Sequence, residues 1–225
     1  MRRGGMTETR REMPPKFSNS RPNLYERLRR VLRRDPVWPE IWKGATIDLC
    51  AMALDAHNRS IASHCFRVAE LASRLTQQFD WGGEREVDIV HNAGWLHDLG
   101  MIGIRDDILN KAGQVNEEEW EVVRRHPDIG ADMMAPHPAL AAFAPIVRHH
   151  HEHWDSSGYP VGLKGTDIPL GARIMAVAEA FDTITHERVY SARVLTPVEA
   201  IRDISEHSGY WYDPVVVDAL QALYE

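Results

Sequence analysis

The sequence contains no apolar stretch of the roughly 18 residues that a membrane span requires, and its first residues lack the apolar core of a secretory signal. Its two cysteines, Cys50 and Cys65, are too few for a disulfide framework and lack the spacing of a thiolate metal site. Both are expected to be buried small residues in a reducing compartment. These absences favour a cytoplasmic protein without a membrane span.

The sequence also lacks internal repeats and convincing segments of alternating apolar and polar residues, so no strands are expected. Apolar residues instead recur at helical spacing, and the hydrophobic content of 44% suits a folded core. The pattern predicts an all-α fold with helices at 24–32, 41–54, 61–79, 84–99, 117–123, 138–150, 172–186, 197–206 and 214–224, and Pro127 can begin a further one. We expect a poorly ordered basic leader at 1–22, N-terminal helices within 23–60 and the main domain at 61–225.

Charge is unevenly distributed along the chain. Residues 1–35 carry 11 Lys or Arg against 4 Asp or Glu, which leaves 15 basic and 29 acidic side chains, a formal charge of −14, for residues 36–225. A nucleic-acid polymer is therefore not expected as a partner of the acidic body. An anionic substrate would need a local device such as metal ions, because the overall field repels it.

Histidines and carboxylates gather at 149–155, which reads His-His-His-Glu-His-Trp-Asp. Such a run can be a solvated tract, but imidazoles beside Glu152 and Asp155 also suit a bound metal. Further candidates fall where predicted helices begin, break or end, so that their side chains can converge. They are His64, His97 with Asp98, His126 before Pro127, and His150 with His151 at the edge of the glycine-rich loop 152–171. A lone histidine such as His64 is more often a satisfied core residue, so the set carries more weight than any member.

The order of these residues resembles the HD superfamily of metal-dependent phosphohydrolases. Gly158-Tyr159-Pro160 makes the chain similar to the HD-GYP branch, whose members hydrolyse cyclic di-GMP. The resemblance runs from about Ile61 to Tyr224, and so long an ordered set is more specific than any single motif. It includes His97-Asp98-Leu99-Gly100, His126-Pro127, His150-His151-Glu152, Gly158-Tyr159-Pro160, Phe181-Asp182 and Arg188.

The resemblance implies a helical HD-domain bundle that holds two divalent metal ions, commonly iron or manganese. The implied ligands are His64, His97, Asp98, His126, His150, His151 and Glu179, with His97 and Asp98 at the catalytic centre and Asp98 bridging the metals. The implied reaction is attack on a phosphodiester phosphorus by a metal-bridging hydroxide, whose pKa two cations lower. Arg188 matches a phosphate-binding arginine. Gly158, Tyr159 and Pro160 would shape the pocket wall, although Tyr159-Pro160 also reads simply as a rigid turn.

The positions that depart from the family pattern include Met101, Glu179, Ser60, Ser156 and Ser191. Met101 stands where the family usually has a lysine that reaches a substrate phosphate, and a thioether neither carries charge nor donates a hydrogen bond. Glu179 replaces an aspartate ligand, and Ser60 replaces a glutamate that adds a third metal in some members. The first hypothesis is a phosphodiesterase that converts cyclic di-GMP to pGpG and onward to GMP. The alternatives are a catalytically weak module that binds signalling proteins, and a phosphohydrolase acting on another nucleotide.

Overall fold

The computed structural model describes residues 43–80, 83–111, 113–186 and 194–225. The predicted leader at 1–22, the helix at 24–32 and Arg188 lie outside these residues. Within them the chain is helical and has no strand, which confirms the all-α prediction. An isolated bridge between Ser208 and Tyr212 is a local pairing only.

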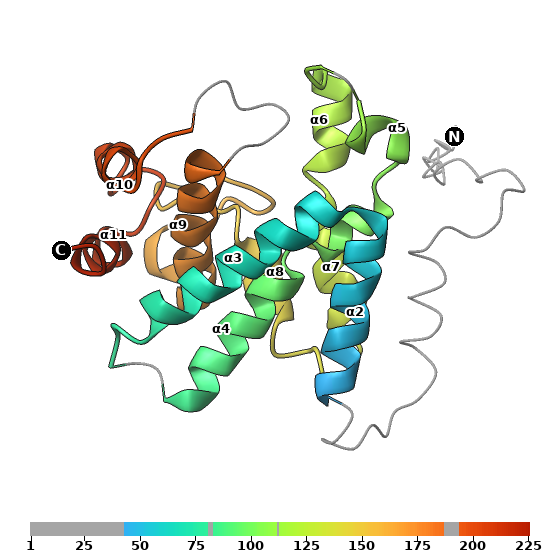
Figure 1. The fold of residues 1–225 in the computed structure, drawn as a ribbon, viewed down its shortest axis with the longest axis horizontal. Helices are drawn as coiled ribbons and strands as arrows, with labels where there is room; N and C mark the ends of the chain where they lie inside the picture. Colours follow the sequence, from blue (N-terminus) through green and yellow to red (C-terminus); the bar gives the residue numbers. More distant parts are fainter. Residues whose placement is uncertain (1–42, 81–82, 112, 187–193) are drawn as a thin grey trace, which may run out of the picture.

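The long helices surround one core, in which α3 runs across the middle of the molecule and packs on α2, α4 and α9 (Figure 1). Helix α7 packs on α8 and on the short helix η2, while α10 and α11 pack on α9. In Figure 1, α5 and α6 lie at one end of the molecule and α10 and α11 at another. The elements are α2 (Lys43–His57), α3 (Arg59–Thr76), α4 (Glu84–Leu96), η2 (Leu99–Gly103), α5 (Asp106–Leu109), α6 (Glu117–Val123), α7 (His126–Met134), α8 (Ala144–His149), η3 (Gly165–Asp167), α9 (Leu170–Thr185), α10 (Pro197–Glu206) and α11 (Pro214–Ala222).

Capping residues fix where several helices begin. The Asn58 side chain accepts hydrogen bonds from the amides of Ser60 and Ile61, so the predicted interruption between α2 and α3 is an N-cap. Asn116 and Glu119 form a reciprocal capping box at the start of α6, which confirms the N-cap predicted there. Local hydrogen bonds set these helix boundaries, and the residues that make them can be recognised in the sequence.

The apolar faces of the helices close over a core that excludes solvent. Val68, Leu75, Leu96, Phe143 and Met175 are each completely buried. Burying a side chain of this size contributes roughly 1.5–3 kcal/mol relative to leaving it exposed. The two cysteines are buried free thiols, as predicted.

Two helix predictions are corrected. The helix expected at 138–150 begins only at Ala144, because Pro145 fits the first turn of a helix but would break its interior. The helix expected to reach Leu99 ends at Leu96 and continues as the 3-10 turn η2. Gly100 lies so close to α7 that a Cβ there would be 1.9 Å from the carbonyl oxygen of His126. This contact brings His97 and Asp98 next to the start of α7.

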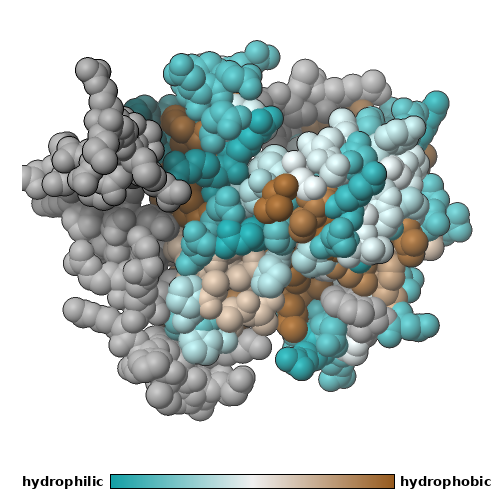
Figure 2. Space-filling model, turned by 180° about the vertical axis from the view of Figure 1, so that it is seen from behind, coloured by the Kyte–Doolittle hydropathy of each residue, from teal (hydrophilic) through white to brown (hydrophobic). Residues whose placement is uncertain are grey.

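On the face shown in Figure 2, hydrophilic residues cover much of the coloured surface and hydrophobic residues form small separate patches. Exposed apolar side chains include Leu49 and Met52 on α2 and Val198 on α10. No helix in the described ranges is long and apolar enough to cross a membrane.

Candidate metal centre

The histidines and the two carboxylates predicted to bind metal come together from five segments. His64 lies on α3, His97 and Asp98 follow α4, His126 begins α7, His150 and His151 follow α8, and Glu179 lies on α9. Three overlapping groups have ligand atoms within 4.8 Å of one another. They are His64 with His97 and Asp98, His126 with His150 and His151, and His97 with His150 and Glu179.

Three of the histidines are oriented by the carbonyl three residues before them. The Nδ1 atoms of His97, His126 and His150 lie 2.8, 2.8 and 2.7 Å from the carbonyl oxygens of Gly94, Val123 and Val147. A carbonyl oxygen only accepts, so each Nδ1 carries a proton, and the neutral form of each ring has its lone pair on Nε2. This second hydrogen bond is the usual way in which a protein fixes the tautomer of a metal-binding histidine.

These carbonyls belong to the last turns of α4, α6 and α8. Carbonyls at a helix C-terminus lack intrahelical partners and carry partial negative charge. The last turns of three helices therefore supply the carbonyls that orient these histidine rings.

Asp98 lies between histidines of two different groups. Its Oδ1 is 3.2 Å from His126 Nε2, and its Oδ2 is 3.5 Å from His97 Nε2. Each oxygen thus faces a different imidazole, which is the arrangement that a carboxylate bridging two metals would need. The His97 ring is completely buried, and its Nε2 makes no hydrogen bond within the described residues.

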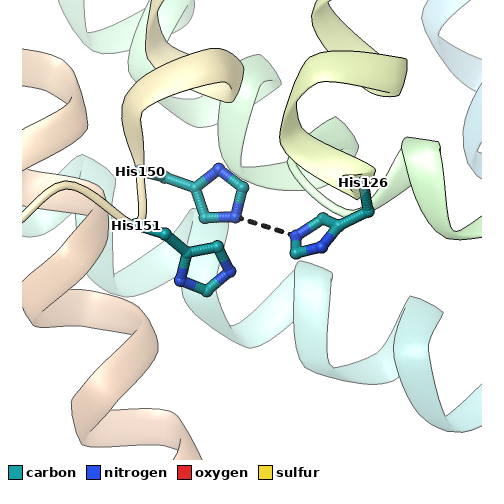
Figure 3. Close-up of side chains that lie close together, drawn as sticks. All are labelled: His126, His150 and His151. Atoms are coloured by element: carbon teal, nitrogen blue, oxygen red, sulfur yellow. Dashed lines mark hydrogen bonds between the residues drawn. The ribbon is translucent and has the colours of Figure 1, made fainter. Parts of the chain in front are cut away.

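The second group is drawn in Figure 3, where His126 from α7 faces His150 and His151 from the end of α8. The Nε2 atoms of His126 and His150 are 3.3 Å apart, although the Nδ1 atom of each ring already donates to a carbonyl. Two facing lone pairs repel, and a cation between or beside them removes that repulsion. The ring centroids of His150 and His151 are 4.1 Å apart.

Burial and charge set the protonation of this cluster. Burial lowers the pKa of His150 and His151 well below the usual histidine value, and the neighbouring histidines lower it further. Burial alone would raise the pKa of Asp98, but the charges of His97 and His126 reverse this effect and lower it. Burial alone would lower the pKa of His97, but the charges of Cys65 and Asp98 raise it well above the usual histidine value. Neutral imidazoles and an ionised carboxylate are the forms that bind metal, so a bound cation would take the place of a proton on His97.

Glu179 reaches the cluster despite its extra methylene. Its Oε2 lies 3.8 Å from Nδ1 of His151, and it belongs to the group with His97 and His150. Tyr159 stacks on His151 with ring centroids 4.7 Å apart and planes at 24°. The Gly-Tyr-Pro segment therefore contributes a wall of the cluster.

The donor set fits divalent metal ions. It combines inward-facing imidazole nitrogens with carboxylate oxygens, and it is buried among apolar helices. Mixed nitrogen and oxygen ligands suit iron, manganese or zinc better than calcium or magnesium.

A buried carboxylate behind His64 was not assigned a role from the sequence. Asp182 Oδ2 is 2.6 Å from His64 Nδ1, and Arg67 donates to both Asp182 oxygens through Nε at 2.5 Å and Nη2 at 2.9 Å. The signal was present as spacing, because Arg67 follows His64 by three residues and Asp182 follows Glu179 by three. Residues at this spacing share one helix face, so the four side chains meet where α3 packs on α9.

The acidic residues of the histidine run, which were not among the predicted ligands, are held by the backbone of the loop. Glu152 is buried and accepts hydrogen bonds from the backbone amides of 161–163 at 2.9–3.2 Å. Asp155 accepts from the amide of Ser157 in a turn. Backbone amides at the loop, rather than a metal, satisfy both carboxylates, because the chain turns away after His151.

The family model of the HD domain matches residues 48–216, more than half of the chain. The chain belongs to the HD-domain family. This membership confirms the family resemblance read from the sequence, and HD-domain phosphohydrolases depend on metals.

Curated relatives of this HD-domain chain include a cyclic di-GMP phosphodiesterase of Thermotoga maritima, which is 37% identical over 182 residues. The match covers 79% of this chain and 48% of the relative. A 3'3'-cGAMP-specific phosphodiesterase of Vibrio cholerae is 33% identical over 172 residues, which cover 76% of this chain and 33% of the relative. The chain thus spans less than half the length of both relatives.

Solved structures show the same fold. Bd1817, an HDG"Y"P protein from Bdellovibrio bacteriovorus, aligns with a TM-score of 0.60 at 16% identity, covering 89% of this chain and 70% of that chain. The HD domain of the L. monocytogenes phosphodiesterase PgpH, in complex with cyclic-di-AMP, aligns with a TM-score of 0.52 at 16% identity, covering 84% of this chain and 98% of that chain. At these identities the likeness concerns the HD fold alone.

Proposed function

We propose that this chain is a metal-dependent phosphodiesterase that hydrolyses cyclic di-GMP to pGpG and onward to GMP. The observation that carries the proposal is the convergence of the His97 and His126 Nε2 atoms on Asp98, with the Nε2 of His150 beside that of His126 and each of the three rings held by a carbonyl at a helix end. The names of the curated relatives support the substrate class. Arg188 is retained as a proposed phosphate contact.

Two divalent ions, iron or manganese, are the proposed cofactors. His64, His97 and Asp98 would hold one ion, and His126, His150 and His151 the other, with Glu179 completing the set and Asp98 between them. Bound there, the metals would supply an activated water and neutralise charge on the phosphoryl oxygens.

The chain's own residues set up this chemistry. The helix-end carbonyls keep the rings in the tautomer that binds metal, and Asp182 does the same for His64. The Tyr159 ring, stacked on His151, closes one side of the cluster from water. Gly158 permits this loop, because a Cβ there would lie 2.3 Å from the amide nitrogen of His153.

The experiment is product analysis by chromatography after cyclic di-GMP is incubated with protein loaded anaerobically with Fe(II) or Mn(II). We expect pGpG or GMP from the unaltered protein and none from His97→Ala/Asp98→Ala. His91→Ala is the matched control, since this half-buried histidine bonds to Ser73 outside the cluster and should keep activity. Metal-loaded protein that yields no product would refute the proposal.

A second substrate candidate is 3'3'-cGAMP. Curated relatives of the chain carry that specificity in their names, at 30–33% identity, beside those named for cyclic di-GMP. Including 3'3'-cGAMP in the same assay distinguishes the two by the ratio of kcat/KM. Metal binding without turnover of any cyclic dinucleotide would instead favour the signalling-module alternative.

A further inference from the structure

The departure at Met101 raises the question of which cation meets a substrate phosphate. Residues 36–225 carry a formal charge of −14, so an anionic substrate depends on local positive charge. Several arginines of the bundle are already occupied by carboxylates. Arg67 binds Asp182, Arg173 binds Asp213, and Arg148 binds Asp128 and Asp132.

Arg124 lies beside the wall of the candidate metal centre. It follows the last residue of α6 and precedes His126 by two positions. Its guanidinium carbon is 5.7 Å from the ring centroid of Tyr159 and 5.8 Å from that of Trp120. Because the Tyr159 ring stacks on His151, the cation and the metal-ligand candidate contact the same aromatic wall.

One edge of this guanidinium is open. Nη1 donates to Glu121 at 2.8 Å, whereas Nε and Nη2 make no hydrogen bond within the described residues. Arg67 uses the same Nε and Nη2 edge to hold both oxygens of Asp182. This edge matches two oxygens of a phosphate as well as it matches a carboxylate.

The Nε atom of Arg124 is buried as well as unbonded. A buried donor without a partner costs about 1–3 kcal/mol, so such atoms in folded proteins usually have a ligand or water that satisfies them. The pair with Glu121 does not remove the cation's charge from the site, since both side chains are substantially exposed and such pairs are weak.

We infer that Arg124 binds a phosphodiester phosphate of the cyclic dinucleotide and supplies the positive charge that Met101 cannot. The inference rests on the proposed function for the identity of the substrate. Trp120 and Tyr159 hold the guanidinium through cation–π contact, so the open edge is ready before the substrate arrives. The geometry thus assigns to the end of α6 a role in substrate binding.

The test compares Arg124→Gln, Arg124→Lys and the control Arg125→Gln in manganese-loaded protein. Arg125 is exposed, and Arg125→Gln removes the same charge at the same helix end as Arg124→Gln does. For Arg124→Gln we expect the KM for cyclic di-GMP to rise roughly tenfold to a hundredfold, the loss typical of a charge-assisted hydrogen-bonded pair. Arg124→Lys keeps the charge without the fork and should lie between. Arg125→Gln should leave KM unchanged.

Binding of pGpG, measured by calorimetry, provides a readout independent of turnover. Its Kd should weaken in the same order as KM, while metal content and Tm stay at wild-type values. If Arg124→Gln folds poorly, Arg124→Lys, which keeps the charge and a long side chain, is compared with the unaltered protein instead.

The outcomes separate the two proposals. Turnover with unchanged KM and pGpG affinity in Arg124→Gln would overturn the role of Arg124 and leave the proposed function standing. Binding of pGpG that depends on Arg124, without turnover by the unaltered protein, would support the phosphate site and remove the phosphodiesterase. Absence of both turnover and binding in the unaltered protein would overturn both.

Discussion

Replacing Asp182 by asparagine tests how far the candidate ligand His64 depends on the group behind it. Asp182 is 3% exposed and accepts from His64 and from both nitrogens of the Arg67 edge. Burial raises the pKa of Asp182, but the hydrogen bonds from His64 and Arg67 lower it more, and the net pKa is about 2. Asparagine keeps the size of the side chain but loses its charge and turns one acceptor into a donor.

The expected cost follows from these contacts. Breaking a fully buried ion pair costs about 3–5 kcal/mol, and the free energy of unfolding should fall by about 2–3 kcal/mol here, because Arg67 remains one-third exposed and can rehydrate. The affinity of the metal site should fall roughly 10- to 100-fold, as for other losses of a group that orients a ligand histidine. Chemical denaturation of metal-free protein measures the first quantity, and competition with a chromophoric chelator measures the second.

Asp88→Asn makes the same chemical change at an exposed position on α4 and serves as the control. The pH dependence gives a second check. Because folding lowers the pKa of Asp182 from 3.8 to about 2, its stabilisation is present above 3.8 and is lost as pH falls toward 2. The difference in free energy of unfolding between wild type and Asp182→Asn should shrink as the pH falls over that interval. If Asp182→Asn had the same stability and metal affinity as Asp88→Asn, the conclusion that Asp182 orients His64 would be refuted.

Three further substitutions probe the packing, the loop and the substrate side. Gly100→Ala should prevent η2 from docking on α7, because the new Cβ would lie 1.9 Å from the carbonyl oxygen of His126. In chemical denaturation the free energy of unfolding should fall by at least the ~1–3 kcal/mol that overpacking a core usually costs. Glu152→Gln should speed hydrogen exchange at the amides of 161–163 while exchange in the helices is unchanged, since it removes charge-assisted bonds worth about 1.5–3 kcal/mol. Met101→Lys should lower the KM for cyclic di-GMP, by up to about tenfold, and an unchanged KM would mean that residue 101 does not reach the phosphate.

Helical periodicity and capping residues were enough to predict most of the fold. Asn58 and Asn116 show the starts of α3 and α6, because each cap is a local interaction. Periodicity failed at Pro145, where apolar spacing continued across a position that only the first turn of a helix tolerates. It also missed η2, whose path depends on Gly100 fitting against α7, a contact between segments distant in sequence.

For the site, the sequence predicted which histidines gather but not how each is oriented. Helix ends and breaks indicated that His97, His126 and His150 can converge. The proton on each Nδ1 follows from carbonyls that only the folded helix ends bring into place. The sequence assigned no role to Glu152, which accepts hydrogen bonds from the loop amides because the chain turns after His151.

The contacts divide the candidate centre into a part that orients the proposed ligands and a part that is proposed to meet substrate. His97, His126 and His150 each bond to a carbonyl three residues upstream, so the end of the preceding helix fixes the ring, whatever stands at the substrate side. Met101 and Arg124 lie outside these bonds. Under the proposed roles, a substitution at either position changes phosphate binding without disturbing the proposed metal ligands, which would account for a complete ligand set beside Met101. Metal affinity and substrate affinity should then vary independently across the variants, since no described hydrogen bond joins Arg124 to a ligand histidine.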